Sequence, residues 1–182
     1  MSEILNQLRR EHADVAQLLR LVDKELGVFD EAGEPDYDLV LGVLDYCAEY
    51  PDRFHHPKED LIYQKLLLRD PQAAEAVGDL EHEHRELAKL TAHFREAVDN
   101  VLNEAEIPRE TVDHVARNFL GFYRSHIEKE DRLFFPAAER VLADEDWAEI
   151  DSHLHSPEDP LFGGETPAHL ARLRESLLHR ES

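Results

Sequence analysis

The chain has 182 residues, and 41 Asp or Glu against 20 Lys or Arg give it a formal net charge of −21 with neutral histidines. This length favours a single domain, and 42% hydrophobic residues can fill its core. A charge this negative repels phosphate backbones and anionic lipid, so nucleic acid and a bare membrane surface are excluded as expected partners.

Cysteine usage and the N-terminal sequence indicate the compartment. The only cysteine, Cys47, cannot form an intrachain disulfide, a zinc ribbon or an iron–sulfur cluster, which fits a reducing environment. The N-terminal residues lack the basic-then-apolar order of a signal peptide, and no eighteen apolar residues run uninterrupted. We therefore expect a cytoplasmic protein.

Apolar residues recur every three or four positions in long stretches separated by glycines and prolines, which is typical of helices. The predicted long helices span residues 2 to 25 or 26, 36 to 69, 70 to 103 and 108 to 143. Gly27 would follow the first helix, and Pro51 and Pro57 predict kinks or a break in the second. Four long helices with short connections predict an all-α fold, an up-down-up-down four-helix bundle over residues 1–143.

Residues 144–182 are too few for a second domain, and we expect a C-terminal appendage of short helices and a loop packed on the bundle. A short helix is predicted over residues 144–154 and a loop over 155–167. An amphipathic helix follows, and its apolar face carries Leu170, Leu173 and Leu177. This last helix should pack outside the bundle.

Each predicted bundle helix carries a histidine where the apolar periodicity requires a core residue. In the first helix this residue is His12 and in the third it is His84, whereas His82 lies about 200° round the helix from His84 and should face solvent. In the second and fourth helices a glutamate follows the histidine at a spacing of four, which places both on the same helical face. The candidate ligands are His12, His55, Glu59, His84, His126 and Glu130.

These side chains would bring four imidazoles and two carboxylates into an apolar interior. Unpaired, each buried polar group would cost roughly several kcal/mol or lose its charge through a shifted pKa. No lysine or arginine lies on the central stripes, so a bound metal is the simplest partner. Six ligands without cysteine exceed what a four-coordinate structural zinc site needs. Two six-coordinate ions that share the glutamates fit better, with iron favoured and manganese as the alternative.

The phase of the second helix leaves an alternative pair open. His56 and Asp60 repeat the spacing of four one residue later, about 100° round the helix. They would replace His55 and Glu59 if Pro57 rotates the segment. We favour His55 and Glu59 because they continue the apolar stripe.

Three neighbouring residues could compete with this set or extend it. Asp131 competes with Glu130 but lies off the stripe. Ferritin-like di-iron bundles use a Glu-x-x-His motif on two helices, and Glu81 with His84 is the single match here, so that chemistry is disfavoured and Glu81 remains a candidate extra ligand or outer partner. Tyr123, one turn before the histidine of the fourth helix, could reach a metal-bound oxygen, although a tyrosine at the core edge is the simpler interpretation.

Four segments carry these residues, REHADV, FHHPKEDLIY, EHEHREL and SHIEKEDRLFFP. Together they resemble the hemerythrin-like HHE cation-binding domain, whose pattern is a His, a His-x-x-x-Glu, a His and a second His-x-x-x-Glu on successive helices. The resemblance covers about residues 1 to 143. It implies a non-heme di-iron centre, oxo- or hydroxo-bridged, whose ligands are His12, His55, Glu59, His84, His126 and Glu130.

The chain departs from known members of this family in two ways. Oxygen-carrying hemerythrins have a further histidine one turn before the one that His84 resembles, and here that position is Leu80. Five imidazoles therefore become four, unless water, Glu81 or another side chain fills the gap. The cysteine-bearing N-terminal region of di-iron proteins involved in iron–sulfur cluster repair is missing, so that role is not assigned.

The resemblance implies a protein that binds or senses dioxygen or a related small oxidant in response to oxygen, iron or redox stress. The alternatives are a di-iron oxidoreductase acting on peroxide, oxygen or nitric oxide, and an iron-sequestering protein. The sequence contains no phosphate loop and no evident nucleophile, so the expected partner is a small diatomic or peroxide ligand at the metal. A binding protein is favoured over an enzyme.

Overall fold

The computed structural model describes residues 2–154, 158–163 and 166–178. Its regular elements are α1 (Glu3–Asp30), α2 (Tyr37–Glu49), the π-helical turn η1 (Pro51–His55), α3 (His56–Arg69), α4 (Pro71–Val77), α5 (Leu80–Leu102), α6 (Arg109–Lys129), the π-helical turn η2 (Glu130–Phe134), α7 (Phe135–Val141), α8 (Asp144–His153), the 3-10 turn η3 (Ala168–Leu170) and α9 (Ala171–Leu178). The prediction of an all-α fold is confirmed for the described residues.

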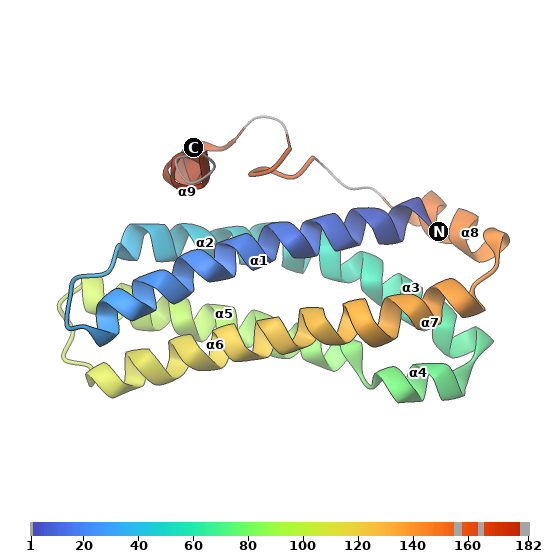
Figure 1. Cartoon of the computed structure of the whole chain (residues 1–182), viewed down its shortest axis with the longest axis horizontal. Coiled ribbons are helices and arrows are strands. Elements are labelled where there is room, and N and C mark those ends of the chain that lie inside the picture. The colour runs from blue at the N-terminus through green and yellow to red at the C-terminus, as the bar shows by residue number, and fades with distance from the viewer. Residues whose placement is uncertain (1, 155–157, 164–165, 179–182) are drawn as a thin grey trace.

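Four long helical segments form a bundle (Figure 1). They are α1, α2 with α3, α5, and α6 with α7, and successive segments run in opposite directions. Each segment packs against the next, and α6 also packs against α1. The α1–α2 and α5–α6 loops lie at one end of the bundle, and α4 and α8 lie at the other (Figure 1). The middle turns of all four segments therefore lie at about the same level.

The apolar core consists of two clusters along the bundle. One includes Leu87 and Phe119 and fills the half that ends at the two loops. The other includes Leu80 and Phe134 and fills the half next to α4 and α8. On α5 the change from one cluster to the other falls between Leu80 and Leu87, on either side of His84. The predicted polar residues thus lie in the layer between two apolar clusters.

The first helix is longer than predicted. α1 continues to Asp30, so the end expected near Gly27 is wrong. The additional turn buries Phe29, whose burial contributes about 1.5–3 kcal/mol and outweighs the cost of about 1 kcal/mol for a glycine within a helix. The chain leaves the helix at Ala32, which adopts a φ of +59°.

The break predicted at the prolines of the second segment is present and takes the form of a π-helical turn. η1 begins at Pro51, and Pro57 lies in the first turn of α3. The fourth segment also contains a π-helical turn, η2, and ends at Val141, close to the predicted boundary.

The third segment was predicted as one helix over residues 70–103, and this is wrong. Gly78 adopts a φ of +90°, which a residue with a side chain rarely does, and it ends α4. Asp79 then accepts a hydrogen bond from the backbone N–H of His82 and starts α5 as its N-cap. The chain changes direction here, so that α4 covers the end of the bundle (Figure 1).

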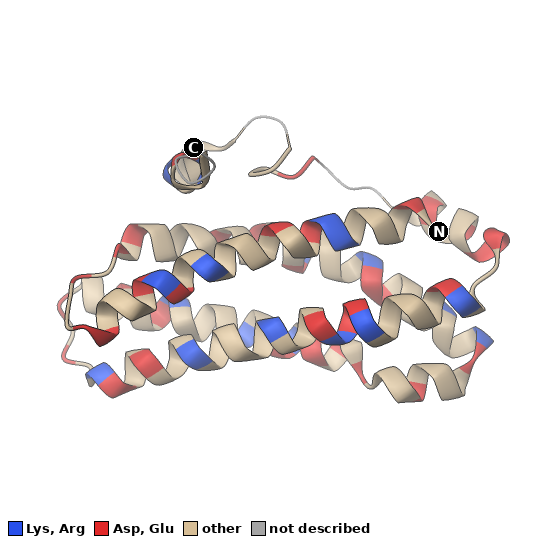
Figure 2. Cartoon of the chain, viewed as in Figure 1, with Lys and Arg blue, Asp and Glu red and all other residues tan. Residues whose placement is uncertain are grey.

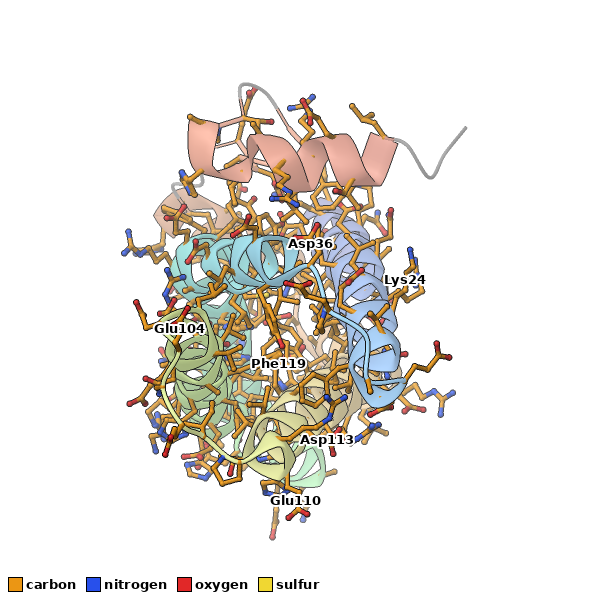
Figure 3. All side chains as sticks on the ribbon, turned by 90° about the vertical axis from the view of Figure 1, so that its left-hand side faces the viewer. Lys24, Asp36, Glu104, Glu110, Asp113 and Phe119 are labelled. Atoms are coloured by element: carbon orange, nitrogen blue, oxygen red, sulfur yellow. The ribbon has the colours of Figure 1, made fainter. Side chains whose placement is uncertain are left out.

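The C-terminal elements pack on the outside of the bundle. α8 contacts α3, and α9 crosses over α2 (Figures 1 and 3). Leu170 and Leu173 are buried against the apolar cluster that includes Leu87 and Phe119, as expected for the apolar face of this helix. Arg172 forms ion pairs with Asp36 and Asp38 at the start of α2. The loop predicted over residues 155–167 lies partly outside the described residues.

Charged residues lie mainly on the outward faces of the helices and at the loops (Figure 2). In the view along the bundle, Phe119 points between the helices, whereas Lys24, Glu104 and Glu110 lie at the periphery (Figure 3). Among the described helices, none is long and apolar enough to cross a membrane.

Candidate metal centre

Two fully buried carboxylates, Glu59 of α3 and Glu130 of η2, lie at the middle of the layer between the apolar clusters. Glu59 Oε1 lies 3.1 Å from His55 Nε2 and 3.3 Å from His12 Nε2, and Glu59 Oε2 lies 3.5 Å from His84 Nε2. Glu130 Oε2 lies 3.2 Å from His126 Nε2 and 3.3 Å from His12 Nε2, and Glu130 Oε1 lies 3.4 Å from His84 Nε2. Each carboxylate therefore spans imidazoles from several helices.

Five buried imidazoles surround these carboxylates, and each has a carboxylate partner at its outer nitrogen. The Nδ1 contacts are His12 with Asp131 at 3.0 Å, His55 with Glu11 at 2.6 Å, His56 with Asp52 at 3.1 Å, His84 with Asp60 at 2.7 Å and His126 with Glu83 at 3.1 Å. A carboxylate at Nδ1 orients the ring and keeps a proton on that nitrogen, which leaves the Nε2 lone pair available for a metal.

The structure brings all six predicted ligands together, each of them 6% exposed or less. Of the two pairs that the sequence left open, it places both histidines but only one carboxylate at the centre. His55 and His56 are both buried at the centre, because the wider π-helical turn η1 separates the phase of α2 from that of α3. Glu59 reaches the centre, but Asp60 lies outside and holds His84.

The other three candidates lie outside the carboxylate pair. Asp131 is half-exposed and holds His12 from the outer side. Glu81 accepts a hydrogen bond from Gln64 Nε2 at 3.1 Å. Tyr123 is buried, and its ring lies 6.4 Å from that of His56. His82, expected to face solvent, is exposed.

Sequence reasoning missed a second layer of buried charge. Glu11 and Lys58 are both buried, and Lys58 Nζ lies 3.3 Å from Glu11 Oε1. Tyr50 donates a hydrogen bond to the same oxygen at 3.2 Å. In the described part of the chain, we find no Lys or Arg within ion-pair distance of Glu59.

The pKa shifts follow from this arrangement. Burial alone raises the pKa of a carboxyl, but the surrounding imidazoles hold the pKa of Glu59 well below its ordinary value and that of Glu130 at about 2. Burial lowers the pKa of His84, but hydrogen bonds to Asp60 and Glu130 outweigh it and raise this pKa to about 12. Burial lowers the pKa of His56 to about 4. The two central carboxylates are therefore charged at neutral pH, and protonated imidazoles such as His84 supply the positive charge that a bound cation would replace.

The donor atoms fit metal cations better than they fit one another. His12 Nε2, His126 Nε2, both oxygens of Glu59 and Glu130 Oε2 are buried without a hydrogen-bond partner among the described residues. Each such atom costs about 1–3 kcal/mol, which coordination to a cation would remove. Two groups of side chains have ligand atoms within 4.8 Å of one another: His56, Glu59, His84 and His126, and His12, His55 and Glu59. Imidazole with carboxylate suits iron and manganese.

A surface hollow of about 230 Å³ reaches this centre from one side. His56 and His84 line it together with carboxylates of Asp52, Asp60 and Glu81. This hollow connects the imidazoles of α3 and α5 with the exterior.

Comparisons with known proteins agree with the geometry. The family model of the Hemerythrin HHE cation binding domain matches residues 3–138. No curated protein and no solved structure matched the chain. The matched range covers every helix of the bundle apart from the last turn of α7, and it contains both groups of donors. The chain therefore belongs to the hemerythrin HHE cation-binding domain family.

Proposed function

We propose that this protein binds a pair of iron ions at the centre and, through them, dioxygen or a related small oxidant. The observation that carries the proposal is the position of Glu59, which belongs to both groups of donors. A carboxylate shared in this way is suited to bridging two cations. Manganese is the alternative metal, because it accepts the same imidazole and carboxylate donors.

The predicted ligands and the carboxylates around them would have different roles at the centre. His12 and His55 would hold one ion, His84 and His126 the other, and Glu59 and Glu130 both. The outer carboxylates orient the imidazoles, so less reorganisation accompanies metal binding. Bound iron would supply Lewis-acid and redox chemistry towards small oxygen-containing molecules.

The surroundings favour a small ligand. The His12 ring stacks on Phe135 at 5.2 Å, and the apolar clusters close the layer on both sides. Such walls restrict access to the side of the hollow lined by His56 and His84, and they leave little room for a large substrate. The single cysteine, Cys47, is unpaired and buried, which supports the reducing cytoplasm as the compartment.

The test is to load purified protein with ferrous iron without oxygen, to count metal per chain, and to record the ultraviolet–visible spectrum while oxygen is admitted and removed. About two irons per chain, with bands that form and revert, is the expected result. Bands that form irreversibly would favour an oxidoreductase, and readily exchanged iron without an optical response would favour iron sequestration. No iron at all, or tight zinc instead, would overturn the proposal.

Two histidines on neighbouring helices, His126 of α6 and His82 of α5, provide the matched control. His126→Ala should lower the iron count by about one per chain, because it removes a donor of one of the two proposed ions. His82→Ala removes an exposed imidazole of α5 and should leave the iron count unchanged. Loss of iron in both variants would indicate adventitious surface binding.

A further inference from the structure

His56 has the surroundings of the other four imidazoles. It is 4% exposed, and its ring stacks on that of His84 with centroids 4.4 Å apart and an interplanar angle of 8°. The His126 ring lies edge-on to it at 5.8 Å. His56 thus lies against both imidazoles of one donor group, and its ligand atom falls within 4.8 Å of theirs.

His56 also has a carboxylate partner at its outer nitrogen, as the predicted imidazole ligands do. Asp52, one turn earlier, lies 3.1 Å from His56 Nδ1. A buried imidazole nitrogen needs a hydrogen-bond partner, and Asp52 supplies one at the side away from the centre. With Nδ1 occupied by Asp52, the nitrogen free to bind a cation is Nε2.

His56 supplies an imidazole where α5 lacks a second one. Leu80, one turn before His84 on α5, is fully buried in the apolar cluster and offers no ligand atom. The α5 segment therefore supplies one imidazole to the centre. The second segment supplies two, because the π-helical turn η1 ends where His55 and His56 meet.

We propose that His56 is a fifth imidazole ligand, which takes the place of the one that Leu80 lacks and makes the two halves of the centre unequal. One cation would be held by His56, His84 and His126, and the other by His12 and His55. This inference rests on the dinuclear centre proposed above.

The variant His56→Phe separates ligation from packing. Phenylalanine keeps a flat ring against His84 but has no ligand nitrogen. If His56 is a ligand, the variant should bind the second iron at least about 10-fold more weakly and retain close to one iron per chain after gel filtration. If His56 only packs, the iron count and the spectrum of the loaded protein should match those of the wild type. The double variant with Leu80→His should regain part of the second iron.

Two further measurements keep the test decisive. Should His56→Phe fold poorly, Asp52→Asn leaves the ring in place and removes only its outer partner, with an expected loss of about 10-fold in iron affinity. The control His82→Phe changes an exposed ring on α5 and should bind iron normally. A wild type without iron contradicts the dinuclear centre itself, whereas two irons in wild type, His56→Phe and Asp52→Asn alike contradict only the role of His56.

A second inference concerns the C-terminal segment, which lies beyond the range that the family model matches. Asp159 Oδ1 accepts hydrogen bonds from the backbone N–H groups of Leu161 and Phe162, and Asp159 Oδ2 accepts one from the Tyr46 hydroxyl at 2.6 Å. Tyr46 is fully buried and Leu161 nearly so. This part of the segment is therefore anchored in the bundle.

The anchor connects to the metal centre through α2. The Tyr46 ring stacks on that of Tyr50 with centroids 6.0 Å apart, and Tyr50 donates a hydrogen bond to Glu11. Glu11 in turn holds His55 Nδ1 at 2.6 Å. Asp159 and His55 thus share one continuous series of contacts.

We infer that docking of residues 158–163 and cation binding at His55 stabilise each other, so that this segment transmits the metal state of the proposed centre. Coupling of this kind is reciprocal, because metal that favours the docked segment must itself bind better when the segment is docked.

Hydrogen exchange of residues 158–163, with and without ferrous iron, tests this coupling. Iron should slow exchange about 5-fold or more in the wild type. Tyr50→Phe, which removes only the hydroxyl that reaches Glu11, should reduce this effect below about 2-fold, whereas Tyr63→Phe on α3 should preserve it. Equal exchange in protein that demonstrably holds iron would overturn the coupling but not the centre.

Discussion

The two His-x-x-x-Glu segments have the same spacing and each adjoins a π-helical turn, yet they use the neighbouring residue differently. In the second segment η1 ends at His55, and the next residue, His56, also lies at the centre. In the fourth segment His126 lies in regular α6 and η2 begins only at Glu130, and the residue after this histidine, Ile127, packs against the apolar cluster. The position of the π-helical turn within the motif therefore decides whether the residue after the histidine lies at the centre.

The outer layers of the two segments differ as well. Behind His55, Glu11 pairs with Lys58, whose side chain is 2% exposed. Behind His126, Glu83 pairs with Lys129, whose side chain is 21% exposed. Exclusion of water strengthens an ion pair and also raises the cost of leaving one of its partners unpaired. Breaking the first pair should therefore lower the free energy of unfolding more than breaking the second.

The largest expected difference is between the two central carboxylates. Glu59→Gln should weaken binding of both irons by more than about 100-fold, exceeding the loss for an outer partner, because Glu59 belongs to both donor groups. Glu130→Gln should weaken iron binding less, because Glu130 belongs to neither donor group. Metal analysis after gel filtration measures both. Equal losses in the two variants would show that the carboxylates are equivalent.

Local periodicity predicts the part of the centre that lies in regular α-helix. His12 and His84 each replace an apolar residue in an unbroken helical stripe, so 3.6 residues per turn place them correctly. Helical periodicity does not place His56 correctly, because a π-helical turn shifts the phase by one residue. The location of such a turn depends on the packing around it. Two adjacent histidines before a proline were the available signal.

The buried ion pair could not be predicted from either helix alone. Glu11 and Lys58 look like surface residues in their own stretches, since charged side chains are seldom fully buried unless paired. Their burial depends on the contact between α1 and α3, which is long-range in sequence. The break at Gly78 has a local signal, a glycine before a capping aspartate, which the continuous apolar periodicity on either side obscured.

The ion pairs offer the second test of the contrast. Lys58→Met should lower the free energy of unfolding of the metal-free protein by about 3 kcal/mol, because it leaves Glu11 buried without its cation. Lys129→Met should cost less than about 1 kcal/mol, since its pair with Glu83 is accessible to water. Urea titrations of both variants measure the two values. Similar losses would mean that depth of burial does not distinguish the pairs.

Outer partners should give smaller effects on iron affinity. Glu11→Gln removes the 2.6 Å partner of His55 and should weaken iron binding by about 30-fold. Asp131→Asn removes the more exposed partner of His12 at 3.0 Å, and about 10-fold is expected. Competition titrations with a coloured chelator would resolve this order, and a larger loss for Asp131→Asn would reverse it.

The smallest expected effect is a pH dependence confined to the outer layer of the first segment. Burial and the nearby carboxylates of Asp159 and Glu11 raise the pKa of Asp14 from 3.8 to about 6. The folded state therefore binds this proton more tightly than the unfolded state, and the resulting stabilisation, full below about pH 4, is lost as the pH rises through 6. Asp14→Asn cannot ionise, so its stability relative to wild type should increase between pH 4.5 and 7, by less than about 1 kcal/mol because water screens a half-buried group. Urea midpoints of the metal-free proteins at both pH values measure this difference, with Asp23→Asn on the exposed face of α1 as the control. A difference that stays constant with pH would mean that the carboxylates behind His55 do not repel one another as their positions indicate.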